Sequence, residues 1–166
     1  MNSSSDYRSH LHGWEELAEI LETHRQRKEK IVTTNGVFDV LHIGHVRYLQ
    51  QARSLGDLLV VGINTDACTR RLKGENRPFV PEAERAEMLL ALQCVDYVTL
   101  FEEPTPERLL EALRPDIHTK GGDYDVEAMP ETQIVRRYGG DVVILPFVEG
   151  HSTTSLAHRI ASRMER

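Results

Sequence analysis

The sequence predicts an α/β domain: a parallel five-stranded sheet with helices on both faces. From Lys30 onward, short runs rich in Val and Ile alternate with amphipathic stretches of about ten residues. Strands that are apolar throughout are typical of a sheet covered on both faces, and their alternation with helices is typical of parallel pairing. At 166 residues the chain is long enough for one core and too short for a second of ordinary size.

The expected elements follow one another without an internal repeat or a low-complexity linker. Strands are predicted at residues 30–38, 58–65, 96–101, 116–120 and 141–147, where β-branched residues gather between turn-forming residues. Helices are predicted at residues 44–56, 81–92, 105–115, 130–139 and 152–164, where apolar residues recur every three or four positions. This alternation places the main domain at residues 30–166.

Two further segments precede this domain. Residues 1–13 are polar and rich in Ser and His, so they are expected to form a flexible tail in which His10 and His12 are bystanders. Residues 14–29 are predicted to form a helix, because apolar residues at helical spacing make one stripe opposite a charged face. His24 edges that stripe. The stripe suits packing within the chain or contact with a second copy, so the sequence leaves a homo-oligomer open.

Composition excludes several classes of protein. The balance of 20 Lys and Arg against 26 Asp and Glu gives a net charge of −6, which argues against a nucleic-acid partner. The first residues lack the apolar region of a signal peptide, and no stretch has the roughly 18 apolar residues of a membrane span. A cytoplasmic protein without a membrane partner is therefore expected. Cys68 and Cys94 are isolated and are expected to be reduced thiols.

Residues suited to chemistry follow the ends of four predicted strands. They lie in the segments "HIGH" (42–45), "NTD" with "RRLKG" (64–74), "KGGDY" (120–124) and "EGHSTT" (149–154). Because open parallel sheets bind ligands outside the carboxyl ends of their strands, these segments should converge on one edge. Each of them brings Gly, hydroxyl or cationic groups. The sequence therefore predicts a ligand site at that edge.

The first of these segments raises three alternatives for His42 and His45. Gly36 and Gly44 allow close approach of the backbone, and the helix that begins here offers unpaired N–H groups to an anion. Both histidines could then donate to phosphate oxygens. They could instead be core or helix-capping residues. Zinc ligation is the third interpretation, although such sites usually need a third protein ligand and helical pairs usually lie four residues apart.

The motifs in these segments resemble those of a known superfamily. "GVFDVLHIGH" resembles the G-x-F-D-x-x-H-x-G-H signature of the cytidylyltransferase-like nucleotidyltransferases, and "EGHSTT" resembles their C-terminal G-x-S-T-T/S element. The similarity runs from about residue 30 to the C-terminus and implies a Rossmann-like nucleotidyltransferase fold. Residues 34–49, 62–92, 95–124 and 149–154 look like the branch that adenylylates a heptose 1-phosphate in ADP-heptose synthesis.

This resemblance implies a reaction. AMP would pass from ATP to D-glycero-β-D-manno-heptose 1-phosphate, with release of pyrophosphate, in lipopolysaccharide core synthesis. Mg²⁺ is expected to arrive with ATP, held largely by phosphate oxygens and water. In many bacteria such a domain is fused behind a sugar kinase, and no kinase sequence is present here. The resemblance therefore implies a separate heptose kinase in the same pathway.

Two alternative functions stay open. Cytidylyltransferases acting on glycerol 3-phosphate or a similar polyol phosphate share the double-histidine motif, but they typically read R-T-E-G where this chain has residues 147–150, "FVEG". That difference favours the heptose branch. A nucleotide-binding sensor without turnover is the other alternative, and the intact His42, His45, Lys73 and "STT" argue against it.

The resemblance also implies roles for individual residues. The catalytic residues would be His42, His45 and Lys73. Nucleotide-binding residues would be Gly36, Val37, Phe38, Gly44, Lys120, Gly121, Gly122, Asp123, Gly150, Ser152, Thr153 and Thr154. Supporting or substrate-binding residues would be Asp39, Asp66, Arg85 and Tyr124. No residue is assigned to a metal.

Ordinary structural roles compete with several of these assignments. Lys73 could be a surface lysine, and Arg85 could be an exposed helix charge paired with Glu82 or Glu84. Asp66 could cap a helix as readily as bind a sugar hydroxyl. Residues 152–154 could likewise cap the last helix without touching a ligand. The sequence does not separate these roles.

Overall fold

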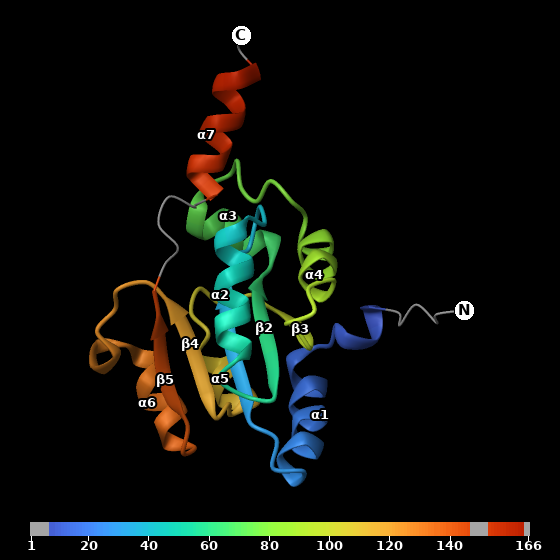
Figure 1. The fold of residues 1–166 in the computed structure, drawn as a ribbon, viewed down its shortest axis with the longest axis vertical. Coiled ribbons are helices and arrows are strands. Elements are labelled where there is room, and N and C mark those ends of the chain that lie inside the picture. Colours follow the sequence, from blue (N-terminus) through green and yellow to red (C-terminus); the bar gives the residue numbers. More distant parts are fainter. Residues whose placement is uncertain (1–6, 147–152, 165–166) are drawn as a thin grey trace.

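The computed structural model describes residues 7–146 and 153–164. Five parallel strands form one sheet in the order β3-β2-β1-β4-β5 (Figure 1), which confirms the predicted fold class. The strands are β1 (Ile31–Gly36), β2 (Leu58–Asn64), β3 (Tyr97–Phe101), β4 (Ile117–Gly121) and β5 (Asp141–Leu145). Four of them lie within the predicted ranges, and β4 extends one residue beyond its predicted range of 116–120.

The helices also match the prediction, with one addition. They are α1 (Trp14–Gln26), α2 (Ile43–Arg53), α3 (Asp66–Lys73), α4 (Glu82–Leu90), α5 (Glu107–Leu113), α6 (Pro130–Arg137) and α7 (Thr153–Met164), with 3-10 turns η1 (Tyr7–His10) and η2 (Val126–Ala128). The sequence did not predict α3, because its residues form no apolar stripe. The Thr65 hydroxyl starts α3 by accepting a hydrogen bond from the Cys68 N–H at 3.2 Å.

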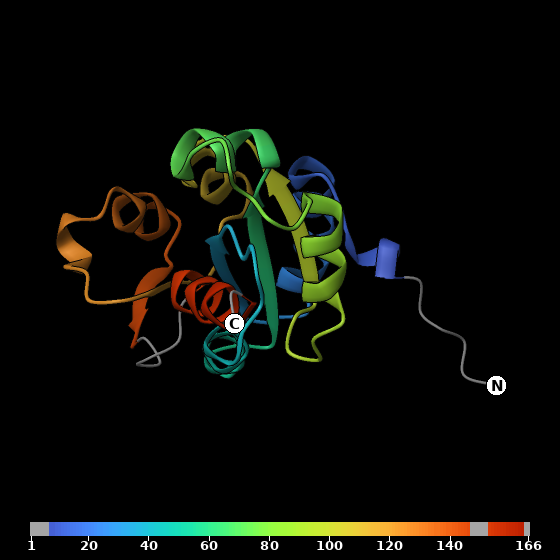
Figure 2. The same ribbon diagram turned by 90° about the horizontal axis from the view of Figure 1, so that it is seen from above.

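Two layers of helices cover the sheet, as Figure 2 shows from above. Helices α2 and α4 pack on one face through a core that includes Leu49, Leu59 and Leu89. Helices α1, α5 and α6 pack on the other face, in two apolar clusters that include Leu21 and Val135. Successive residues of β2 face alternate layers, because side chains alternate along a strand.

The strand order places a switch point between β1 and β4. From β1 the chain winds through α2, β2 and β3 toward one edge, and it then returns to β4 and β5 on the other side of β1. Crossover helices on the two sides of β1 therefore leave the carboxyl ends of β1 and β4 uncovered, which is where open sheets bind ligands. Figure 1 shows α7 standing above this edge.

Residues 7–13 depart from the expected flexible tail. Leu11 forms a bridge with Val98 on β3, and the His12 N–H donates to the Val98 carbonyl at 3.2 Å. His10 hydrogen-bonds through Nδ1 to the Asp96 carbonyl at 2.9 Å. The polar composition of this segment predicted a flexible tail. The contacts that hold the segment use backbone groups and imidazole rings, and hydropathy does not reveal such contacts. The first six residues lie outside the described part of the chain.

The histidines near this end gather around Tyr97, the first residue of β3. The His10, His12 and His24 rings lie with their centroids 5.5, 6.0 and 5.8 Å from the Tyr97 ring. His24 also hydrogen-bonds through Nε2 to the Tyr97 hydroxyl at 3.0 Å and through Nδ1 to Glu29. These rings therefore pack at the amino end of a strand, whereas the predicted site is at the carboxyl ends.

Deleting residues 1–12 should lower stability without lowering kcat. The deletion removes the hydrogen bond to Val98 and the Leu11 contact, which together contribute on the order of 1–2 kcal/mol. Urea unfolding measures the first effect and pyrophosphate release at saturating substrate the second. A large loss of turnover in a variant that unfolds like the full chain would instead show that this segment reaches the site.

None of the described helices is long and apolar enough to cross a membrane.

Candidate active site

A cavity of about 330 Å³ lies at the carboxyl ends of β1 and β4, where the sequence predicts a ligand site. Most of the predicted site residues line it. These are Gly36, Val37, Phe38, Asp39, His42, Gly44, His45, Lys73, Lys120, Gly121, Thr153 and Thr154. They come from the β1–α2 connection, the end of α3, the end of β4 and the start of α7, so segments far apart in sequence do meet at one edge.

The two histidines lie side by side at the start of α2. His42 is the residue before the helix, and its carbonyl accepts the His45 N–H at 2.9 Å. Their rings stack with centroids 3.9 Å apart, and the Phe38 ring lies 5.2 Å from that of His45. Phe38 itself has a left-handed backbone, with φ at 49°, a conformation that costs a non-glycine residue about 1 kcal/mol. Such strain is typical of functional sites.

His45 is held neutral at physiological pH. Burial is the main cause, and the nearby His42 and Lys73 act in the same direction; the Val40 backbone opposes them, and together they lower the pKa of His45 to about 4. Its Nδ1 atom is buried and has no hydrogen-bond partner among the described residues. A buried ring nitrogen without a partner is unfavourable, so the position suits a ligand that supplies one.

Cationic side chains enter the cavity from both sides of β1. Lys73 comes from the end of α3 and Arg77 from the loop that follows. Lys120 comes from β4, where its Nζ donates to Glu131 at 2.8 Å and to Asn35 at 3.3 Å. Burial raises the pKa of Glu131, but the Lys120 hydrogen bond and charge outweigh it, so that pKa is lowered. The cavity therefore combines the neutral imidazole of His45 and the ring of His42 with fixed positive charge, an arrangement suited to phosphate oxygens.

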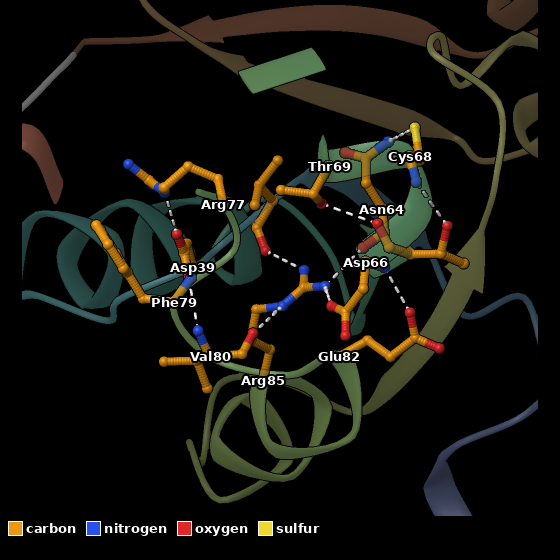
Figure 3. Close-up of polar contacts among 12 residues, drawn as sticks. Asp39, Asn64, Asp66, Cys68, Thr69, Arg77, Phe79, Val80, Glu82 and Arg85 are labelled. Carbon is orange, nitrogen blue, oxygen red and sulfur yellow. Dashed lines mark hydrogen bonds and ion pairs between the residues drawn. The ribbon is translucent and has the colours of Figure 1, made fainter. Parts of the chain in front are cut away.

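Asp39 organises the loop on the β2 side of the cavity (Figure 3). Its carboxylate is 2% exposed and accepts hydrogen bonds from the Phe79 N–H at 2.7 Å and the Val80 N–H at 3.0 Å. The other oxygen accepts from Nε of Arg77. These three hydrogen bonds show that the buried Asp39 holds the loop in position rather than serving as a ligand for a cation.

Arg85 is fully buried and not exposed on α4, and Figure 3 shows its polar contacts. Its guanidinium donates to the carbonyls of Val80, Val37 and Asn64 at 2.9, 2.6 and 2.9 Å, and to the Asp66 carboxylate at 2.7 Å. The alternative of a surface pair with a neighbouring glutamate is therefore wrong. Arg85 ties the β1–α2 connection, the end of β2 and the loop before α4 together.

Asp66 does not reach the cavity. It is the first residue of α3, where Thr65 and not Asp66 is the cap, so the predicted capping role is wrong. Its carboxylate pairs with Arg85, and its N–H donates to Glu82. Asp66 therefore acts on the site through Arg85.

Some predicted residues fall outside this cavity. Gly122, Asp123 and Tyr124 continue beyond Gly121 without lining it, and the Tyr124 side chain is 53% exposed. The predicted residues Gly150 and Ser152 lie outside the described part of the chain.

Three lining residues were not predicted: Asn35, Tyr48 and Arg77. The Tyr48 hydroxyl lies 2.7 Å from the Thr34 hydroxyl and donates to Thr119 at 3.2 Å, and burial raises its pKa. Tyr48 follows His45 by one helical turn, a spacing that could have indicated it. Arg77 lies in the segment at residues 62–92 that resembles the heptose branch, but that resemblance assigned it no role.

Stability should fall as the pH is lowered from about 6.5 toward 4. Burial lowers the pKa of His118, which is fully buried on β4, to about 3, and that of His45 is lowered to about 4. Between these values and 6.5 the unfolded chain binds more protons than the folded one, so the free energy of unfolding decreases with falling pH. Urea unfolding at pH 7, 6 and 5 measures the slope, at most about 1.4 kcal/mol per pH unit for each histidine. Equal stability at pH 7 and 5 would contradict these depressed values.

Comparison with known proteins identifies the class. Residues 33–159 match the cytidylyltransferase-like family, so the chain belongs to that family of nucleotidyltransferases. It is 51% identical over 161 residues to the bifunctional protein HldE of Syntrophotalea carbinolica, and 52% identical over 151 residues to HldE of Pseudomonas aeruginosa. These matches cover 97% and 91% of the chain. The chain spans about a third of the length of these relatives, 33% and 32%.

Solved structures agree with this assignment. A lipopolysaccharide core biosynthesis protein from Thermoplasma volcanium is 32% identical with a TM-score of 0.60, and the match covers 74% of this chain and 99% of that one. A pantoate-beta-alanine ligase from Francisella tularensis has a TM-score of 0.55 at 11% identity, covering 94% of this chain and 79% of the ligase. The second likeness shows a shared fold only.

Proposed function

We propose that this chain transfers AMP from ATP to D-glycero-β-D-manno-heptose 1-phosphate, giving ADP-heptose and pyrophosphate for lipopolysaccharide core synthesis. The observation that carries the proposal is the cavity that His45 lines together with Lys73, Arg77 and Lys120, the buried Nδ1 of His45 having no partner among the described residues. The names of the HldE relatives and of the Thermoplasma protein support the choice of pathway. A cytoplasmic location belongs to the same proposal, because both substrates are water-soluble phosphates.

The chemistry needs charge stabilisation rather than a base. The sugar 1-phosphate has a second pKa near 6 and is mostly dianionic at pH 7, so its oxygen can attack directly. The new bond forms between this oxygen and the α-phosphorus of ATP, while the bond from the α-phosphorus to the bridging oxygen breaks and pyrophosphate leaves. The enzyme must hold two anions together and offset their repulsion. His42 and His45 would donate to oxygens of the α-phosphate.

The start of α7 suits the departing pyrophosphate. Thr153 and Thr154 line the cavity in the first turn of this helix, where free N–H groups and hydroxyls can bind an anion. Lys73, at the end of α3, would neutralise phosphate charge. Gly121 and Lys120 would lie beside the nucleotide.

Mg²⁺ would come with ATP. The described residues contain no group of three His, Cys, Asp or Glu side chains arranged to hold a metal ion, and Asp39 already accepts three hydrogen bonds. The lining residues therefore do not make a protein cage for Mg²⁺. Triphosphate oxygens and water suit that ion, which usually keeps several waters. A kinase that supplies the sugar 1-phosphate and a homo-oligomeric state remain predictions.

The proposal is tested by the choice of nucleotide. ATP should give a higher kcat/KM than CTP, because backbone groups of the segments at residues 120–124 and 149–154 are expected from the sequence to select adenine. Of these residues, Lys120, Gly121, Thr153 and Thr154 line the cavity, and residues 149–152 lie outside the described part of the chain. The measurement is pyrophosphate release for ATP and CTP, each against heptose 1-phosphate, mannose 1-phosphate and glycerol 3-phosphate. A preference for CTP with glycerol 3-phosphate would replace the proposal by a polyol-phosphate cytidylyltransferase. Nucleotide binding without pyrophosphate in any combination would leave a sensor.

A further inference from the structure

Arg77 is one of the lining residues that were not predicted from the sequence. It lies in the loop between α3 and α4, and its side chain is 16% exposed. Nε of its guanidinium donates to Asp39, and the guanidinium carbon lies 4.5 Å from the centre of the Phe79 ring. Both partners hold the guanidinium plane in one orientation.

The other edge of this guanidinium has no partner within residues 7–146 and 153–164. Among the residues that the structure describes, Nη1 and Nη2 of Arg77 make no hydrogen bond or ion pair. A guanidinium carries five N–H donors, and the Asp39 contact engages only the one on Nε. Four donors remain on a group that lines the cavity, in the fork geometry that matches two oxygens of one phosphate.

The anchor of Arg77 does not depend on a substrate. Asp39 is buried, and it also accepts the N–H groups of Phe79 and Val80, two and three residues after Arg77. These bonds hold the loop beside the cavity before any ligand arrives. Because the Arg77 side chain and its loop are already ordered, the guanidinium can bind an anion at a low cost in conformational entropy.

The position of Arg77 points to one of the two substrates. Lys120, Gly121, Thr153 and Thr154, which we assign to the nucleotide, come from β4 and from the start of α7. Arg77 comes from the opposite side of β1, through the loop after α3. A phosphate bound by Arg77 would therefore face these nucleotide-binding groups across the cavity.

We propose that Arg77 binds the phosphate of the acceptor through its two Nη atoms. This inference rests on the proposed function. Two phosphate oxygens held by the guanidinium leave the third free to attack the α-phosphorus. Arg77 stays charged at any relevant pH, so it offsets the repulsion between the two substrates without taking up the proton of either.

The test separates acceptor binding from nucleotide binding in three variants. Arg77→Gln removes the charge and the fork, Arg77→Lys keeps the charge but not the fork, and Arg71→Gln is the control. Arg71 lies on α3, its side chain is 53% exposed, and it pairs with Glu102 outside the cavity. The measurements are the KM for heptose 1-phosphate, the Kd for a non-hydrolysable ATP analogue by calorimetry, and the melting temperature.

Arg77→Gln and Arg77→Lys should each raise the acceptor KM by roughly 10- to 100-fold, the range for losing hydrogen bonds to a charged group. The Kd for the ATP analogue should stay within about twofold, and Arg71→Gln should match the wild type. An unchanged acceptor KM, or an equal loss of ATP-analogue affinity, would overturn the proposal. So would recovery of the acceptor KM in Arg77→Lys, because Arg77 would then serve only as the counter-charge of Asp39.

A wild type that releases no pyrophosphate with any sugar 1-phosphate would refute the proposed function but not this inference. Inorganic phosphate is then titrated calorimetrically into wild type and Arg77→Gln, each saturated with the ATP analogue. Phosphate binding that the substitution abolishes supports the inference. Binding that is equal in both proteins, or absent from the wild type, overturns it.

Discussion

Replacing His45 by alanine is expected to lower kcat by about 10²- to 10³-fold, the range for losing one preorganised donor to a developing charge. The ring of His45 is buried beside His42, its pKa is lowered to about 4, and its Nδ1 has no partner among the described residues. A donor whose partner oxygen changes charge during attack stabilises the transition state more than the bound substrate. ATP affinity should therefore fall much less than kcat.

His24→Ala is the matched control for this experiment. His24 is also a partly buried, hydrogen-bonded histidine, but it contacts Tyr97 and Glu29 away from the cavity. Turnover should survive this change, whereas His42→Ala should resemble His45→Ala with a greater loss of nucleotide binding. If His45→Ala melts several degrees lower and keeps a near-normal kcat, the histidines are structural. Loss of activity to a chelator in excess Mg²⁺ would favour the zinc interpretation.

Replacing Arg85 by methionine should destabilise the fold by about 3–5 kcal/mol, the usual cost of removing one partner of a buried ion pair. Arg85 is fully buried, and its loss leaves the Asp66 carboxylate and the carbonyls of Val37, Asn64 and Val80 without their donor. Methionine fills a similar volume but cannot donate. Urea unfolding gives the change in free energy.

Arg137→Met is the control for Arg85→Met. The Arg137 side chain is 60% exposed and pairs with Glu111 at 3.3 Å, so its loss should change stability by less than about 1 kcal/mol. Equal effects at the two positions would show that burial of Arg85 carries no special stability. The KM values of Arg85→Met should also be higher than those of the wild type when both are measured below the melting temperature. Arg85 donates to the carbonyl of Val37, which lines the cavity, and to that of Val80, whose N–H binds Asp39.

The sequence was sufficient to predict the sheet and the position of the cavity. The spacing of apolar residues and the amino-acid composition distinguish buried strands from helices. Parallel pairing then brings the carboxyl ends of the strands to one edge of the sheet. His42, His45 and Lys120 could be placed there without any knowledge of their contacts. The TM-score of 0.60 to the Thermoplasma protein is consistent with that fold.

The rest depends on tertiary contacts that no local pattern reveals. Arg85 has Glu82 and Glu84 as sequence neighbours, yet it is buried against Asp66, 19 residues away. Arg77 is held by Asp39, 38 residues earlier. Helix α3 owes its start to Thr65 rather than to an apolar stripe. For the two arginines a polar partner distant in sequence decides the outcome, and for α3 a local cap does. Hydrophobic periodicity describes only the packed faces.

The segment at residues 11–12 also affects how this protein behaves when it is concentrated. The outer side of β3 is an edge of the sheet, and an edge with free N–H and C=O groups can recruit a strand from another molecule. Here the Val98 carbonyl already accepts the His12 N–H. The contact within the chain thus occupies a place where intermolecular strand addition would begin. A chain lacking it should aggregate edge to edge before its turnover fails.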